Sequence, residues 1–198
     1  MANTHSIAAF IEANYHEYWG YHNYPANQCA CIRKVEDEWG ILGNFAQSSL
    51  EVGGVKFNCV EQLYQMMKFK DAAILKDLHG LKGMGVKMKA KHYETDHRRE
   101  DWGSMLVDAL KFCLVKKYEQ CPEFRKALQQ TKERGLYIVE DQSSRQKKKP
   151  DAWGVKPNGD KYTGPNLLGV LLMELRDGEG KLEYRLPADA LEFVKKLL

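Results

Sequence analysis

The sequence lacks the paired cysteines, the long apolar runs and the leader segment that several classes of protein require. Its 198 residues include five cysteines but no CxxC pair, which argues against a disulfide framework and against a zinc site. No apolar run approaches about 18 residues, the length that crosses a membrane. The first ten residues, MANTHSIAAF, lack the basic and apolar regions of a signal peptide. We therefore expect a soluble, cytoplasmic protein with reduced thiols, no metal and no membrane partner.

Internal repeats and a dinucleotide-binding fingerprint are also missing. Gly80, Gly83 and Gly85 do not have GxGxxG spacing and do not follow a convincing strand. The net charge of +3 tolerates a phosphate-bearing partner without requiring nucleic acid. With 29% charged and 43% hydrophobic residues, a chain of this length suits one domain that buries its own core.

Hydrophobic periodicity predicts a helix-rich fold with a few short strands, which is the α+β class in a single domain. The clearest helix covers residues 101–119, where apolar residues recur at i, i+3, i+4 and i+7. Further helices are expected over residues 6–19, 57–69, 122–130, 166–176 and 189–198. Strands are expected over residues 29–35 and 136–140, with a hairpin over 50–57 that turns at Gly53 and Gly54. The pattern predicts a helix break over 21–28, a surface stretch over 78–100 and a long loop over 141–165.

The stretch FNCVEQLYQMMKF, residues 57–69, poses the most specific question. Asn58 is placed as an N-cap, and Glu61 three positions later completes a capping-box pattern. Glu61, Gln65 and Lys68 lie within about 60° of one another on a helical wheel, opposite an apolar face. This polar face is either solvated or the wall of a pocket, and we favour the pocket wall.

Other residues suited to chemistry each have a simpler interpretation. Trp102 could stack on a ligand, but it also continues an apolar stripe that is typical of a core. Asp151 and Trp153, in PDAWG, could serve a site or fasten a turn. Asn166, in GPNLLG, is placed to cap a helix whose free N–H groups could receive an anion. The basic run RQKKK, residues 145–149, is either a solvated loop or a nucleic-acid patch.

Taken in order, these stretches resemble the NADAR family over about residues 39–177. The matching segments are WGILGNF (39–45), FNCVEQLYQMMKF (57–69), Trp102 with its helix, PDAWG (150–154) and GPNLLGVLLMELR (164–176). On this basis we expect one domain with an N-terminal extension over 1–35, a NADAR-like core over 39–177 and a C-terminal helical extension over 178–198.

The resemblance implies hydrolysis of N-glycosidic bonds without a cofactor or metal. The implied substrates are phosphorylated ribosyl intermediates of riboflavin synthesis and ADP-ribose attached to guanine, free or in nucleic acid. Glu61 and Asp151 match the acidic site positions, so they are the expected catalytic residues. The expected substrate-binding residues are Asn44, Lys68, Trp102, Trp153 and Asn166.

Cleavage of a ribosyl C–N bond passes through an oxocarbenium-like transition state, which needs a carboxylate, a positioned water and a protonated or hydrogen-bonded leaving base. Glu61 and Asp151 could take these roles in either order, and the loop over 141–165 is expected to close over the substrate as a lid. Two alternatives stay open. One is a non-catalytic ADP-ribose or nucleotide-binding module, and the other is a nucleic-acid scaffold that binds through RQKKK.

Overall fold

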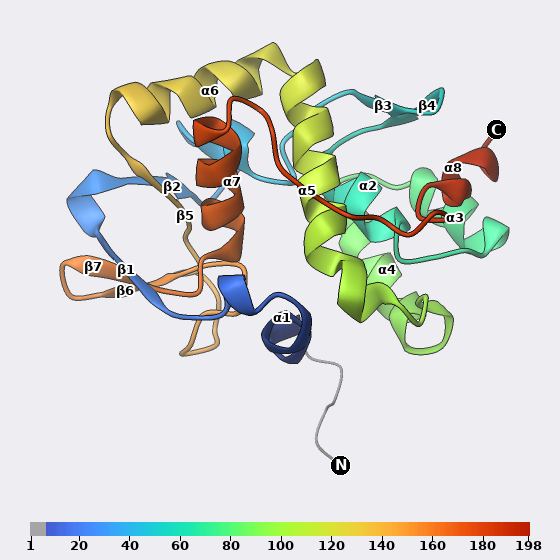
Figure 1. The fold of residues 1–198 in the computed structure, drawn as a ribbon, viewed down its shortest axis with the longest axis horizontal. Helices are drawn as coiled ribbons and strands as arrows, with labels where there is room; N and C mark the ends of the chain where they lie inside the picture. The colour runs from blue at the N-terminus through green and yellow to red at the C-terminus, as the bar shows by residue number, and fades with distance from the viewer. Residues whose placement is uncertain (1–6) are drawn as a thin grey trace. The chain divides into compact units, whose positions relative to one another are not determined.

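The computed structural model describes residues 7–198, and their contacts form two compact units (Figure 1). Among the described residues, the first unit comprises 7–43 and Glu123–Lys181, and the second comprises Asn44–Pro122 and Leu182–Leu198. Helices joined by short strands make up both units, so the predicted α+β class is confirmed. The division at 1–35, 39–177 and 178–198 stays a prediction. Over residues 7–198, no helix combines the length and the apolar character that a membrane crossing needs.

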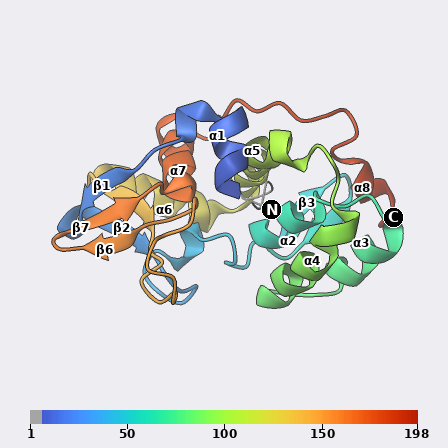
Figure 2. The ribbon, with the colours of Figure 1, turned by 90° about the horizontal axis from the view of Figure 1, so that it is seen from below.

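The first unit combines helices with two small sheets. Its elements in chain order are α1 (Ile7–Asn14), η1 (His16–Tyr18), β1 (His22–Pro25), η2 (Ala26–Gln28), β2 (Cys29–Ile32), η3 (Gly40–Leu42), α6 (Pro122–Glu133), β5 (Tyr137–Glu140), β6 (Lys156–Asn158), β7 (Lys161–Gly164) and α7 (Leu167–Asp177). The antiparallel strands β1, β7 and β6 form one sheet in that order, as Figure 2 shows, and β2 pairs with β5 in parallel. Tyr24, Val139, Val155 and Tyr162 pack into a core cluster of this unit.

Helix α7 lies directly against strand β5 (Figure 1). The approach is so close that a Cβ atom on Gly169 would lie 2.1 Å from the carbonyl oxygen of Ile138. Only glycine fits at that point, because any side chain would push the helix off the strand. The second glycine of GPNLLG is therefore explained by packing.

The second unit is mainly helical. Its elements are β3 (Leu50–Val52), β4 (Val55–Phe57), α2 (Val60–Met66), α3 (Ala72–His79), α4 (Met84–His97), α5 (Trp102–Gln120) and α8 (Glu192–Lys195). Helix α5 contributes more buried residues than any other element of this unit, and its apolar stripe is buried as predicted. The β3–β4 hairpin turns at Gly53 and Gly54, whose φ angles are +55° and +85°, the left-handed conformation that glycine accepts most readily.

Four regions differ from the prediction, one of them the segment just before residue 78, where helix α3 has no predicted counterpart. The expected break over 21–28 contains strand β1, and the expected loop over 141–165 contains the hairpin β6–β7. These four-residue and three-residue strands carry little periodicity of their own, and β1 pairs with a strand far away in the sequence. The expected surface stretch over 78–100 contains α4 instead, a helix in which only Val86 and Ala90 are buried. So small a buried face leaves almost no helical signal in the sequence.

Candidate active site

The start of helix α2 differs from the predicted capping box by one residue. Cys59 is the N-cap and makes no side-chain cap hydrogen bond. Instead, Gln62 reaches back, and its Oε1 accepts from the backbone N–H of Asn58 at 2.7 Å. The backbone N–H of Glu61 donates to the carbonyl oxygen of Asn44 at 2.9 Å. The capping role assigned to Asn58 and Glu61 is therefore wrong, and the Glu61 carboxylate is available for another purpose.

The polar face of α2 is buried. Glu61, Gln65 and Lys68 are only 5%, 4% and 6% exposed, so the solvated-face interpretation is wrong. The Nε2 of Gln65 donates to Oε1 of Glu61 at 2.9 Å, and the Nζ of Lys87 lies 3.6 Å from the same oxygen. A carboxylate has about four lone-pair positions. The Glu61 carboxylate therefore keeps acceptor capacity for a ligand.

Lys68 lies between an acid and two aromatic rings. Its Nζ is 2.5 Å from Oε1 of Glu94, and it stands 5.5 Å from the ring centroid of Trp102 and 5.7 Å from that of Tyr64. Burial lowers the pKa of the Lys68 amine, and the ion pair with Glu94 opposes that shift. The cation–π geometry and the ion pair together hold this lysine in place.

Trp102 is the first residue of helix α5 and is only 3% exposed. Its ring meets that of Tyr64 edge to face, with centroids 5.2 Å apart and an interplanar angle of 60°. Trp102 therefore belongs to the core of the second unit, as one interpretation of the sequence predicted, and it also contacts the Lys68 ammonium. Whether the indole contacts a substrate stays a prediction.

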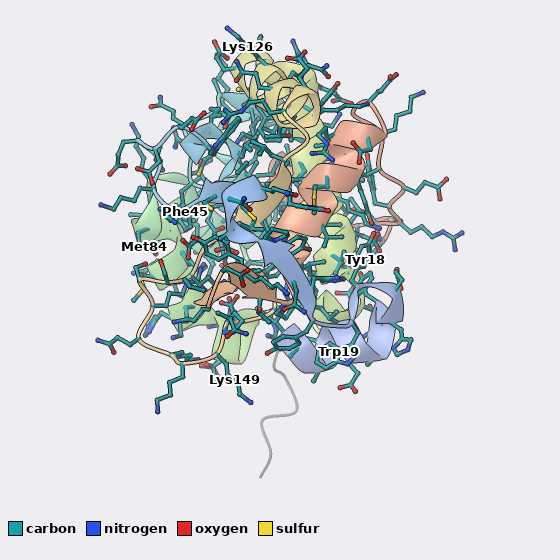
Figure 3. All side chains as sticks on the ribbon, turned by 90° about the vertical axis from the view of Figure 1, so that its left-hand side faces the viewer. Tyr18, Trp19, Phe45, Met84, Lys126 and Lys149 are labelled. Carbon is teal, nitrogen blue, oxygen red and sulfur yellow. The ribbon has the colours of Figure 1, made fainter. Side chains whose placement is uncertain are left out.

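The sequence reading missed three contributors to this cluster. Lys87 and Glu94 both come from α4, the helix that the prediction replaced with a surface stretch. Phe45 is the third, and its ring lies 5.4 Å from the Nζ of Lys87. Phe45 and Met84, the first residue of α4, are labelled in Figure 3. A helical pattern over 84–97 would have placed Lys87 and Glu94 on one face, because they are seven residues apart.

Asn44 also borders Glu61. Beyond the backbone contact already described, its side-chain Oδ1 is buried and has no hydrogen-bond partner among residues 7–198. The Oε1 of Gln65 is likewise buried and has no hydrogen-bond partner within those residues. Such unpaired buried acceptors are unusual, because native proteins satisfy nearly all buried polar atoms.

In the first unit, Asp151 forms a compact turn. Its Oδ1 accepts from the Nε2 of Gln142 at 2.5 Å and from the backbone N–H of Trp153 at 3.0 Å, while Oδ2 pairs with Arg145. The side chain is 41% exposed. The turn interpretation is therefore confirmed for Asp151, and the catalytic role stays a prediction.

Asn166 supports the framework of the first unit. Its Nδ2 donates to the carbonyl oxygen of Ile138 at 2.9 Å, and its Oδ1 accepts from the N–H of Glu140 at 3.1 Å. Asn166 stands at the N-cap position of α7, as predicted, but its side chain makes no helix-cap hydrogen bond. This amide ties the start of α7 to strand β5.

The start of α7 does not offer free N–H groups to an anion. The backbone N–H groups of residues 166, 167 and 168 each donate at 3.1 Å to carbonyl oxygens of residues 154, 152 and 153. The expected anion site at this helix start is therefore wrong, because the PDAWG segment already occupies these donors. A substrate-binding role for Trp153 or Asn166 stays a prediction.

The predicted residues thus fall into two groups. The second unit holds Asn44, Glu61, Lys68 and Trp102, joined through Tyr64, Gln65 and the α4 residues. The first unit holds Asp151, Trp153 and Asn166, joined through the PDAWG turn and its contacts with α7. All five cysteines are free thiols. Across residues 7–198, no three His, Cys, Asp or Glu side chains are grouped to hold a metal ion.

The fold is α+β, and its second unit encloses a carboxylate among ammonium groups and aromatic rings. Residues 31–178 match the model of the NADAR domain, and the chain belongs to this family. The predicted resemblance is confirmed.

Comparisons with individual proteins agree with this assignment. The chain is 30% identical to the N-glycosidase YbiA of Shigella flexneri serotype 5b over 144 residues, which cover 72% of this chain and 83% of that protein. It is 26% identical to the N-glycosidase Npun_R5314 of Nostoc punctiforme over 147 residues, 73% of this chain and 88% of that one. The NMR structure of the Escherichia coli protein YbiA superposes with a TM-score of 0.62 at 26% identity, covering 81% of this chain and 91% of that chain.

Proposed function

We propose that this protein hydrolyses the bond between ribose and a nucleobase in a phosphorylated ribosyl or ADP-ribosyl compound. As a NADAR-domain protein similar to named N-glycosidases, it is a hydrolase that acts on N-glycosyl bonds. The class of compound is the part of the proposal that goes beyond these comparisons. Two members of that class are a ribosylaminouracil phosphate and guanine that carries ADP-ribose.

The surroundings of Glu61 support the proposal most strongly. A carboxylate that is 5% exposed and keeps unused acceptor positions can face the positive charge that develops on the sugar. Removal from water strengthens this electrostatic interaction, because the local dielectric is low. The hydrogen bond from Gln65 fixes the carboxylate orientation, so little reorganisation is needed during the reaction.

The cations around Glu61 suit the charged part of such a substrate. Lys87 is 43% exposed along its side chain and lies within 3.6 Å of the carboxylate, so it can exchange that ion pair for a phosphate oxygen. Lys68 is fixed by Glu94, Tyr64 and Trp102 and supplies a second positive charge. The role proposed for Asp151 rests on its motif alone and is tested separately.

A direct test uses two compounds and one matched variant. The purified protein is incubated with a ribosylaminouracil phosphate and, separately, with ADP-ribosylated guanine in DNA, and free base or sugar product is followed by mass spectrometry. Glu61→Gln serves as the control, because it keeps the size and hydrogen-bonding ability of the side chain but removes its charge. We expect product from at least one compound with the parent protein and almost none with the variant.

Two other outcomes would oppose the proposal. Tight binding of either compound without product, in both proteins, would support the non-catalytic binding module. Product formation at the same rate in the parent and in Glu61→Gln would remove Glu61 from the chemistry.

A further inference from the structure

Helix α2 carries two buried glutamines whose surroundings differ in an informative way. Gln62 is 0% exposed, and both ends of its amide are bonded to protein. Its Oε1 accepts from the N–H of Asn58, and its Nε2 donates to the carbonyl oxygens of His79 and Leu81, both at 3.0 Å. Gln62 therefore has a complete structural role in joining the start of α2 to the end of α3 and the residues that follow it.

Gln65 is equally buried but is bonded at one end only. Its Nε2 donates to Glu61, whereas its Oε1 has no hydrogen-bond partner within residues 7–198. A carboxylate only accepts hydrogen bonds, so the NH₂ end of the amide must face Glu61. The carbonyl oxygen, at the other end of the amide that contacts Glu61, is therefore fixed as a buried acceptor.

A buried acceptor without a donor costs stability, typically more than a hydrogen bond contributes when it forms. The side-chain Oδ1 of Asn44, a residue whose backbone carbonyl accepts from the N–H of Glu61, is also buried without a hydrogen-bond partner within residues 7–198. Of the two buried glutamines of α2, Gln65 alone has such an acceptor, because the amide of Gln62 is bonded at both ends. This contrast indicates acceptors that are kept for donors on a ligand.

We propose that Oε1 of Gln65 accepts a hydrogen bond from a ribose hydroxyl of the substrate, specifically the 2′-hydroxyl, and so selects ribosyl over 2′-deoxyribosyl compounds. This inference rests on the proposed function, because it assumes that the ribosyl carbon reacts beside Glu61. The 2′-hydroxyl is carried by the carbon next to the reacting one, so it is the sugar donor nearest the carboxylate. Hydrogen bonds to this hydroxyl strengthen as the oxocarbenium ion develops. Gln65 is thus a specificity-determining residue and, through its Nε2, a positioning residue for Glu61.

The experiment compares two isosteric variants, Gln65→Met and Gln62→Met, on a matched pair of substrates. The pair is a ribosyl compound that the parent cleaves and its 2′-deoxyribosyl counterpart. The readout is kcat/KM for the ribosyl compound divided by kcat/KM for the 2′-deoxyribosyl compound. We expect Gln65→Met to lower kcat/KM on both substrates through the lost contact with Glu61. It should lower the ratio by a further factor of about 10 to 100, the value of one buried hydrogen bond to the hydroxyl.

The control variant should behave in the opposite way. Gln62→Met loses the hydrogen bonds that its amide makes to the framework, so it should melt earlier than Gln65→Met and keep the parental ratio. A parental ratio in Gln65→Met, or an equal change of the ratio in both variants, would overturn the inference.

A second measurement on the parent protein does not depend on the folding of any variant. Binding of ribose 5-phosphate and of 2-deoxyribose 5-phosphate is compared by calorimetry, and the deoxy compound should bind about 10-fold or more weakly. Equal affinities would overturn the inference. If ribose 5-phosphate bound more tightly than the deoxy compound but the protein hydrolysed no ribosyl compound, the proposed function would be overturned. The acceptor role of Gln65 would then still stand.

Discussion

Glu61 and Asp151, the two carboxylates singled out in the sequence, have opposite surroundings. Glu61 is buried on a seven-residue helix and depends on partners from Asn44, Gln65 and α4. Asp151 is 41% exposed and is bonded to neighbours no more than nine residues away. Burying a charge is costly unless other groups compensate it. The second unit therefore maintains Glu61 against an energetic cost, whereas Asp151 forms a local turn that would be stable without any function.

The largest expected effect comes from Glu61→Gln. Loss of the charge beside the reacting carbon should lower kcat by about 10³-fold, within the range that a single acid–base or charge-stabilising group contributes. The cap of α2 should survive, because Gln62 makes it. Steady-state kinetics and a thermal melt check both parts. A variant with parental kcat would place Glu61 among structural charges.

Asp151→Asn tests the other side of the comparison. If Asp151 takes part in turnover, kcat should fall by about 10²-fold, with a melting temperature within a few degrees of the parent. The amide can still accept from the N–H of Trp153, and the lost ion pair with Arg145 is exposed and so contributes little. The measurements are kcat and circular dichroism melting. Unchanged turnover would reduce Asp151 to a turn residue.

Lys117 allows a measurement of how much the burial of a charged group lowers the stability of the second unit. It is 0% exposed, and burial lowers the pKa of its amine to about 7. Between this pH and about pH 10, the unfolded chain binds a proton that the folded protein does not, so stability rises with pH across that window.

Lys117→Met should therefore stabilise the protein most below pH 7, where the buried amine is charged. The gain should shrink by about 2 kcal/mol or more between pH 7 and pH 9. Urea unfolding at pH 6, 7.5 and 9 measures it. A gain that does not vary with pH would show that the lysine stays protonated in the fold throughout this range, so that burial does not lower its pKa.

Trp102→Phe separates packing from ligand contact. The smaller ring leaves a cavity beside Tyr64 and weakens the contact with Lys68, so we expect a loss of about 1–2 kcal/mol in stability. If the indole also contacts substrate, kcat/KM should fall about 10-fold, measured well below the melting temperature. An early melt combined with full activity would assign Trp102 to the core alone.

The smallest effect is expected from neutralising Lys147, Lys148 and Lys149 together. All three side chains are exposed, and Lys149 is labelled in Figure 3. Turnover of a small ribosyl phosphate should stay unchanged. The kcat/KM for a DNA-attached substrate should fall severalfold and depend less on the salt concentration. An equal loss on both substrates would exclude a path for nucleic acid along this loop.

Periodicity predicted the elements that bury a continuous apolar face. Helix α5, strand β5 and the β3–β4 hairpin lie where the sequence placed them, because each carries its own signal within a few residues. Helices α3 and α4 and strands β1, β6 and β7 were missed. Strands β1 and β7 pair with each other across most of the chain, and α4 and the three strands have too few apolar residues to form a pattern.

The sequence by itself determined the family, the α+β class and the fact that Glu61, Gln65 and Lys68 share one helical face. Only the tertiary structure decided that this face is buried, that Gln62 rather than Glu61 caps the helix, and that Lys87 and Glu94 complete the cluster. It also decided that the N–H groups at the start of α7 are occupied. The physical reason is that an apolar side chain needs only burial, which periodicity reveals. A buried polar atom needs a specific partner, and here several of those partners come from distant segments.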